Sequence, residues 1–326
     1  MRYDESRYTD PCCGYDTSTN QKHQKPQGKI RGSDMKTLEQ KRKLKVITFN
    51  LNTWQNRKKK LSNQKILDWV MKTLSPDVMI LTEAAIPVPQ SLIDAGWSVV
   101  HREGGVPGRS GWGTVIAVRS PLNIRHITTA GIRAAHKLDT NFPGHLTAAD
   151  ITLGDEYIAT AVGLHLRCRT DKNGKFIGAT EYDLYEMKPD FQHLYNGGER
   201  RLIVAGDFNY SFLSMPYALW DLNLVDPFST LYPYTFQQFG PKSQPAKLDY
   251  IIVDRHLGNK IVERKGGFKD FPTSRSVSDH APLSVTIDLD LDVLSCSCGS
   301  KLRRPADSFA SQLRCPKCNE VQRLAA

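Results

Sequence analysis

Several polar side chains of this 326-residue chain stand at the edges of short apolar runs, where the sites of sheet-based proteins usually form. Carboxylates, amides and imidazoles are the groups that bind divalent cations and transfer protons. Taken singly, each has an ordinary explanation as a cap, a turn residue or a packed histidine. Together they are hard to explain as independent accidents and indicate one shared functional site. The set is Asn50, Glu83, His165, Asp207, Asn209, Asp249, Asp279 and His280.

The segments that carry these residues resemble a known family. They are FN at 49–50, ILTEA at 80–84, GLHL at 163–166, GDFN at 206–209, LDY at 248–250 and SDH at 278–280. Their order is that of the endonuclease/exonuclease/phosphatase superfamily, which includes deoxyribonuclease I, apurinic endonucleases, neutral sphingomyelinases and inositol polyphosphate phosphatases. The histidine at 165 resembles the deoxyribonuclease I-like branch, because apurinic endonucleases place a tyrosine-containing segment there.

The resemblance implies an α/β (α+β) four-layer sandwich, in which two mixed β-sheets pack face to face and helices flank them. It also implies a Mg²⁺ (or Mn²⁺) cofactor, with Glu83 as the main ligand and Asn50 and Asp279 close by. Such a cation neutralises the charge that grows on the phosphate oxygens during hydrolysis. Mg²⁺ prefers oxygen ligands and needs only one or two carboxylates.

The same resemblance implies catalytic roles for five residues. Asp207 would orient or deprotonate the attacking water, and Asn209 would contact the phosphate. His280 would bind the scissile phosphate or act as the base, with Asp249 holding its ring. His165 would donate to a phosphate oxygen or to the leaving group. Whether Asp207 or His280 is the base stays open.

Two further groups of cations are candidates for substrate binding. Arg167 follows His165 by two residues, so in a continuing strand it shares the same face. The run Arg57, Lys58, Lys59 and Lys60 follows the Asn50 strand and could contact a phosphate backbone. The alternatives are an ordinary surface arginine and a solvated helix start.

Four of the seven cysteines are clustered near the C-terminus as Cys296, Cys298, Cys315 and Cys318. Their spacing, C-x-C-x16-C-x2-C, predicts a tetrahedral Zn²⁺ site, and the segment resembles a small zinc ribbon. A segment this short does not fold without a cross-link or a bound metal, so the zinc would be structural. Its basic residues fit nucleic acid, and a protein partner is the alternative.

The apolar runs predict the elements that position these residues. Strands are expected at 45–51, 78–81, 114–118, 157–166, 201–205, 248–253 and 281–287, an amphipathic helix at 61–74 and a further helix at 182–194. The domain organisation that we expect is a disordered basic tail at 1–43, a catalytic domain at 44–290 and the zinc ribbon at 291–326.

Charge is unevenly distributed along the chain. The formal net charge is +10, with +5 in residues 1–45, +3 in residues 291–326 and only +2 between them. Basic flanks beside a phosphoesterase body favour a polyanionic substrate. The hypothesis is therefore a nuclease acting on DNA or RNA. The alternatives are hydrolysis of a small or lipid-linked phosphoester, or a non-catalytic adaptor. No run of 18 apolar residues is present, so we expect a cytoplasmic protein with no membrane partner; the oligomeric state is left open.

Overall fold

The structure is a computed structural model. It describes residues 43–52, 63–104, 112–127, 146–166, 169–170, 176–179, 181–212, 214–231, 233–237, 244–290, 292–304, 312–315, 317–318 and 321–323. The chain divides into two units, Met1–Gln40 and Lys41–Ala326, and every described residue belongs to the second. The expected disordered tail at 1–43 thus lies, except for Lys43, outside the described residues.

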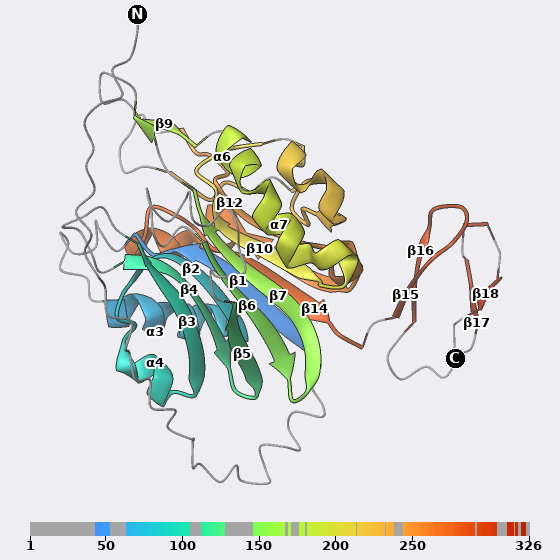
Figure 1. Ribbon diagram of the computed structural model, residues 1–326, viewed down its shortest axis with the longest axis horizontal. Helices are drawn as coiled ribbons and strands as arrows, with labels where there is room; N and C mark the ends of the chain where they lie inside the picture. The colour runs from blue at the N-terminus through green and yellow to red at the C-terminus, as the bar shows by residue number, and fades with distance from the viewer. Residues whose placement is uncertain are drawn as a thin grey trace, which may run out of the picture. The chain divides into compact units, whose positions relative to one another are not determined.

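Two six-stranded sheets form the body (Figure 1). In the first sheet the order is β13 (Ile261–Gly266), β14 (Leu283–Asp288), β1 (Lys43–Asn50), β2 (Val78–Ala85), β4 (Trp112–Arg119) and β3 (Trp97–Gly104). In the second it is β11 (Leu224–Val225), β12 (Asp249–Asp254), β10 (Leu202–Asp207), β7 (Glu156–His165), β6 (Leu146–Leu153) and β5 (Leu122–Ile127). Each sheet is mixed, because β1–β2 and β7–β10 are parallel while the other pairs are antiparallel.

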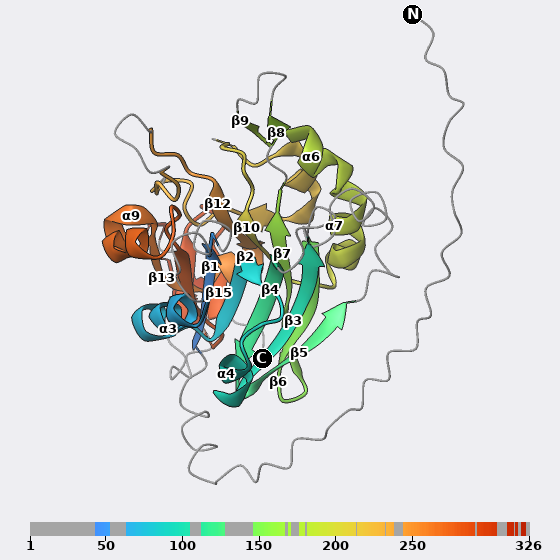
Figure 2. The ribbon, with the colours of Figure 1, turned by 90° about the vertical axis from the view of Figure 1, so that its left-hand side faces the viewer.

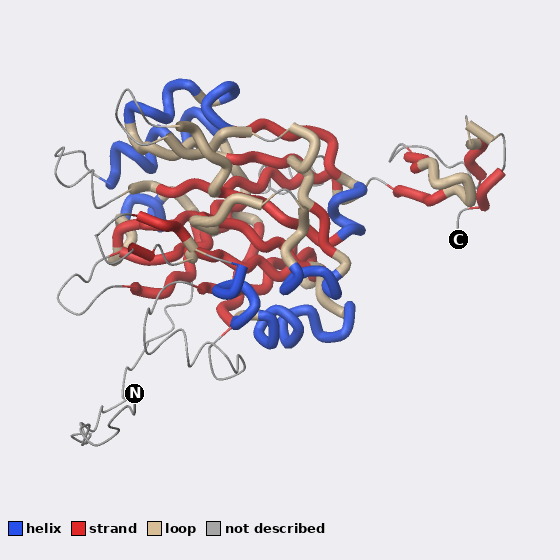
Figure 3. Tube along the Cα trace, turned by 90° about the horizontal axis from the view of Figure 1, so that it is seen from above, coloured by secondary structure: helices blue, strands red, loops and turns tan. Residues whose placement is uncertain are grey.

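Helices cover the outer faces of both sheets (Figures 2 and 3). The first sheet carries α3 (Asn63–Leu74), α4 (Gln90–Asp94), α9 (Gly267–Asp270) and η4 (Pro272–Ser276). The second carries α6 (Glu181–Glu186), α7 (Lys188–Tyr195) and η3 (Tyr217–Leu222). Two short helical segments complete the body, η2 (Asn196–Gly198) and α8 (Arg255–Asn259). The expected four-layer sandwich is confirmed.

Three apolar cores separate these four layers, and strand alternation builds them. In β10, Leu202 and Val204 pack toward the helices, whereas Ile203 and Ala205 pack between the sheets. All four side chains are fully buried. A strand that is buried on both faces reads as an unbroken apolar run, which is why RLIVA was recognisable in the sequence.

The single helix expected over 182–194 is wrong. The structure has two helices, α6 and α7, separated at Met187. Pro189 explains the break, since proline has no N–H and its ring would clash with the carbonyl of Tyr185 in a continuous helix. At the second position of α7 the same proline is well tolerated.

Three short strand pairs lie outside the two large sheets. They are β8 (Arg169–Thr170) with β9 (Phe176–Gly178), β15 (Asp292–Ser295) with β16 (Lys301–Arg304), and β17 (Gln312–Arg314) with β18 (Val321–Arg323). Among the described residues, no helix is long and apolar enough to cross a membrane.

Candidate active site

Strand register brings three of the expected site residues together. In the parallel pair β7–β10, His165 lies beside Asp207, and in the antiparallel pair β10–β12, Asp207 lies beside Asp249. In the other sheet, the parallel pair β1–β2 ends with Asn50 beside Thr82. Carboxyl ends of parallel strands meet at one edge, so both sheets present polar groups at the same edge of the sandwich.

Glu83 reaches this edge through an irregular stretch of β2. The β2–β4 register shifts between Leu81 and Ala84, which is a β-bulge, and Glu83 has φ 47°. A bulge turns a side chain away from its regular alternation, and left-handed φ is unusual for a residue such as glutamate. Both features aim the carboxylate at Asn50, whose Nδ2 lies 3.3 Å from Oε1 of Glu83.

The glycine of the GDFN segment lies in close contact with the backbone of the neighbouring strand β7. Gly206 has φ 144°, and a Cβ there would lie 1.8 Å from the carbonyl oxygen of Leu164. Only glycine fits such an approach. After it, Asp207 accepts the backbone N–H of Asn209 at 2.8 Å, and Asn209 donates from Nδ2 to the Leu166 carbonyl at 3.0 Å. These bonds fix both side chains at the end of β10.

Asn50 bridges the two carboxylates. Its Nδ2 donates to Oδ2 of Asp207 at 2.8 Å as well as to Glu83, and its Oδ1 accepts the N–H of Asn52 at 2.8 Å. The amide oxygen therefore faces Asn52 in this arrangement, and the amide nitrogen faces the carboxylates. Asn50 as a metal ligand stays a prediction.

The two histidines flank Asp207. Nε2 of His165 lies 3.8 Å from Glu83 Oε1 and 3.9 Å from Asp207 Oδ2, and Nε2 of His280 lies 3.8 Å from Asp207 Oδ2. Nδ1 of His280 is hydrogen-bonded to Oδ2 of Asp249 at 2.8 Å. This bond leaves Nε2 of His280 directed at the site, the orientation expected for a group that handles a phosphate or a proton.

Burial and charge shift the pKa values of these groups. Burial raises the pKa of Glu83, and it raises the pKa of Asp207 to about 7. Burial alone would lower the pKa of His280, but the Asp249 and Asp207 carboxylates outweigh it and raise the pKa to about 10. His280 is therefore an imidazolium at neutral pH.

The donor set suits a hard divalent cation. One oxygen each from Glu83 and Asp207 and a nitrogen of His165 lie within 4.8 Å of one another. Burial raises the pKa of both the Glu83 and the Asp207 carboxyl, so a positive charge placed between them would favour their ionised forms. A cation with a preference for oxygen would supply that charge, so the residues fit the metal.

Asp279 lies close to the same groups. Its Oδ1 accepts a hydrogen bond from Nδ2 of Asn52, and its negative charge helps to raise the pKa of both Glu83 and His280. Asp279 as a metal ligand stays a prediction. The sequence reasoning did not single out Asn52, although it stands two positions after Asn50. The signal that could have identified Asn52 is its position, as a polar residue two positions after the asparagine that ends the strand.

Sequence reasoning also missed the residues that hold Asp249 and the SDH segment. Thr235 is fully buried, and its Oγ1 accepts the backbone N–H groups of Leu248 and Asp249, each at 3.0 Å. Ser278 donates to the carbonyl of Asn50 at 2.8 Å and accepts the N–H of His280 at 3.1 Å. These bonds join the ends of β1, β12 and the segment before β14.

The expected substrate cations lie outside the described residues. These are Arg167 and the run Arg57, Lys58, Lys59 and Lys60.

Comparison with known proteins identifies the family. A sequence model of the Endonuclease/Exonuclease/phosphatase family matches residues 47–280, which is more than two thirds of the chain. The chain belongs to this family. It is therefore a metal-dependent phosphoesterase, as its sequence motifs indicated, and the matched range includes every candidate catalytic residue named above. No curated protein sequence matches the chain.

Solved structures show the same fold at low identity. An AP endonuclease from Archaeoglobus fulgidus superposes with a TM-score of 0.55 at 18% identity, covering 76% of this chain and 100% of that one. An AP endonuclease from Leishmania major gives 0.53 at 18%, covering 75% and 87%. A 3′ phosphatase from Neisseria, bound to product DNA hairpin, gives 0.53 at 16%, covering 75% and 99%.

The four clustered cysteines also come together. Their sulfur atoms lie within 4.8 Å of one another, with Cys296–Cys318 at 3.3 Å and Cys298–Cys315 at 3.6 Å. A tetrahedron with Zn–S bonds of about 2.3 Å has S···S edges of about 3.8 Å, close to these values. Hydrogen bonds with Ser300 lower the pKa of Cys298 to about 6, which favours the thiolate that binds metal.

Proposed function

We propose that this phosphoesterase is a nuclease that uses Mg²⁺ (or Mn²⁺) to hydrolyse phosphodiester bonds in DNA or RNA. The observation that carries the proposal is the cluster of half-buried Glu83 with the buried residues His165, Asp207 and the His280–Asp249 pair at one edge of the sandwich. Such a cluster can hold a cation, a water molecule and an anionic phosphate together.

Glu83 would be the main ligand of the cation, with Asn50 and Asp279 close by as the family resemblance suggests. When bound, the cation supplies Lewis-acid stabilisation of charge on the phosphate oxygens. His165, 3.8 Å from Glu83, would donate a hydrogen bond to a phosphate oxygen or to the leaving group.

Proton transfer is assigned to Asp207. A base that works near neutral pH needs a pKa near neutrality, and burial brings the pKa of Asp207 to about 7. His280, with a pKa raised to about 10, would stay protonated and bind the scissile phosphate. Asp249 would hold that ring in place, and Asn209 would contact the phosphate beside Asp207.

Two considerations favour nucleic acid as the substrate. The proteins with similar structures include AP endonucleases and a 3′ phosphatase bound to a product DNA hairpin. The basic flanks of the chain, +5 in residues 1–45 and +3 in residues 291–326, would add long-range attraction for a polyanion. Within this proposal, residues 44–290 are the catalytic domain and 291–326 form a ribbon with structural Zn²⁺.

A substrate panel tests the function. Plasmid DNA, single-stranded DNA, RNA, an inositol phosphate and sphingomyelin are incubated with the protein and Mg²⁺, and again with EDTA. Cleavage of a nucleic acid that EDTA abolishes is the expected result. Turnover of only the small or lipid phosphoester would reject the nuclease assignment, and no turnover of any substrate would favour the adaptor.

A further inference from the structure

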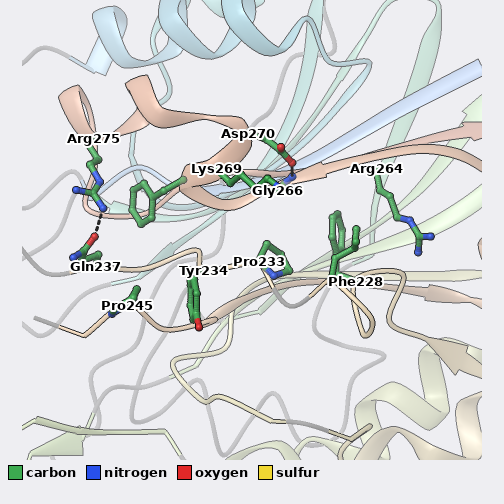
Figure 4. Close-up of a pocket in the computed structure, with 12 residues that line it drawn as sticks. Phe228, Pro233, Tyr234, Gln237, Pro245, Arg264, Gly266, Lys269, Asp270 and Arg275 are labelled. Atoms are coloured by element: carbon green, nitrogen blue, oxygen red, sulfur yellow. Dashed lines mark hydrogen bonds between the residues drawn. The ribbon is translucent and has the colours of Figure 1, made fainter.

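A pocket of about 540 Å³ is lined by Gln237, whose N–H donates to the carbonyl of Asp279, and by none of the residues assigned to catalysis. One wall is the segment with Pro233, Tyr234 and Gln237, and the opposite wall runs from Arg264 through α9 to Arg275 (Figure 4). The two walls are held together by the N–H of Phe268, which donates to the carbonyl of Tyr234 at 3.1 Å.

The pocket lining has an excess of positive charge. Three cations, Arg264, Lys269 and Arg275, accompany a single acid, Asp270. The carboxylate of Asp270 accepts the backbone N–H of Gly266 at 2.7 Å, so its charge is partly engaged within its own wall. The pocket should therefore attract an anion.

Arg275 is positioned to contact that anion. Its guanidinium stacks over the Phe268 ring, 4.6 Å from the centroid, and donates from Nη2 to the side-chain oxygen of Gln237 (Figure 4). Arginine has five N–H donors, and stacking leaves its in-plane donors available to a phosphate. Tyr234 lines the same pocket with 52% of its surface exposed, which offers a face for stacking.

The pocket wall is continuous with the site. Phe236 forms a β-bridge with His280, and the two rings lie 4.9 Å apart. One residue further on, the N–H of Gln237 donates to the carbonyl of Asp279 at 3.0 Å. A single extended segment therefore contacts the catalytic histidine through Phe236 and lines the pocket through Tyr234 and Gln237. Two residues of such a segment span about 6.6 Å, which is comparable with the step between successive phosphates of a strand.

We propose that this pocket binds the nucleotide next to the scissile phosphate, with its phosphate at Arg275 and Lys269 and its base on Tyr234. The inference rests on the proposed nuclease function and deepens it. A phosphorylated ligand without a base would use the cations but not Tyr234, so the pairing of aromatic and cationic residues favours a nucleotide.

The test compares two substrates in Mg²⁺. One is a single-stranded thymidine oligonucleotide, which fills the pocket, and the other is bis(4-nitrophenyl) phosphate, which has no neighbouring nucleotide. Arg275→Ala should lower kcat/KM for the oligonucleotide about twofold to fivefold more than for the small diester, as expected for one exposed ionic contact, and Tyr234→Ala at least about fivefold more, as expected for a lost stacking contact. The loss should appear mainly in KM, and Arg275→Lys should restore part of it.

Arg201→Ala is the matched control, because Arg201 is exposed and precedes β10 at the end opposite to Asp207. Oligonucleotide cleavage by the wild type with no difference between Arg275→Ala, Tyr234→Ala and the control would overturn the subsite. Equal losses on both substrates would also overturn it, since the pocket would then act only by shaping the site. If the wild type cleaves neither this oligonucleotide nor the plasmid DNA or RNA of the substrate panel, the nuclease function itself is rejected.

Discussion

Replacing Thr235 by valine removes one hydroxyl oxygen, and this loss should lower both the stability and the catalytic activity. Oγ1 of Thr235 accepts two buried backbone N–H groups, those of Leu248 and Asp249. Valine has nearly the same shape but no acceptor, so both donors lose their partner in a fully buried place. Each unsatisfied N–H costs about 1–3 kcal/mol, which gives a loss of about 2–6 kcal/mol in the free energy of unfolding.

Thermal unfolding and kinetics measure this effect. Thr235→Val should lower Tm by roughly 4–24 °C in a domain of this size. It should also lower kcat, because the same bond holds the backbone of Asp249, whose carboxylate orients His280. Thr235→Ser is the control, since it keeps the oxygen and removes one methyl group, at a cost of about 1 kcal/mol. If Thr235→Val and Thr235→Ser have the same Tm and kcat, the oxygen does not position Asp249 and the reasoning is refuted.

Three further predictions concern other groups. Glu83→Gln should lower turnover more than about a hundredfold and abolish the rise in Tm that Mg²⁺ causes. Its Tm in EDTA should equal that of the wild type in EDTA. Full turnover by the purified variant would contradict the assignment of Glu83 as a metal ligand. Lys247→Ala should lower the free energy of unfolding by about 3–5 kcal/mol in urea titrations, because it leaves Asp226, 2.6 Å from the buried ammonium, without its partner. The control Lys265→Ala, from the exposed pair with Glu263, should cost less than about 1 kcal/mol; equal losses in the two variants would refute the contrast between the buried and the exposed ion pair. Cys315→Ser should release one zinc per chain by elemental analysis, and wild-type protein without zinc would show that the four thiols serve another purpose.

Sequence alone predicted the central strands because they are buried on both faces. The runs of β1, β2, β7, β10 and β12 are nearly unbroken in apolar residues, and they end in the polar groups that marked the site. Edge strands gave a much weaker signal. Four consecutive residues of β13 are exposed, and β5 has only one fully buried residue, so neither shows a clear apolar pattern.

The supporting residues of the site could not be predicted in the same way. Thr235 and Asp249 are 14 positions apart, and their contact depends on a non-local bridge between Phe236 and Ala246. The contact between Asn52 and Asp279 joins residues that are 227 positions apart. A threonine or an asparagine has no pattern of its own in such a place, since only the assembled sheets decide what it meets.

Backbone strain and buried charge coincide at the catalytic edge. Glu83, Asn52 and Asn209 all have left-handed φ values, between 46° and 47°. Asparagine tolerates this region, but glutamate does not favour it. The backbone strain at Glu83 therefore costs about 1–3 kcal/mol, and the packing of the surrounding sheets must offset it. The carboxylate so placed is half-buried, and its pKa is raised. A bound cation would relieve the electrostatic part of this cost and leave the backbone part unchanged. The catalytic edge should therefore be less stable without metal than the apolar cores beneath it. Metal binding should then stabilise the folded protein as well as activate it.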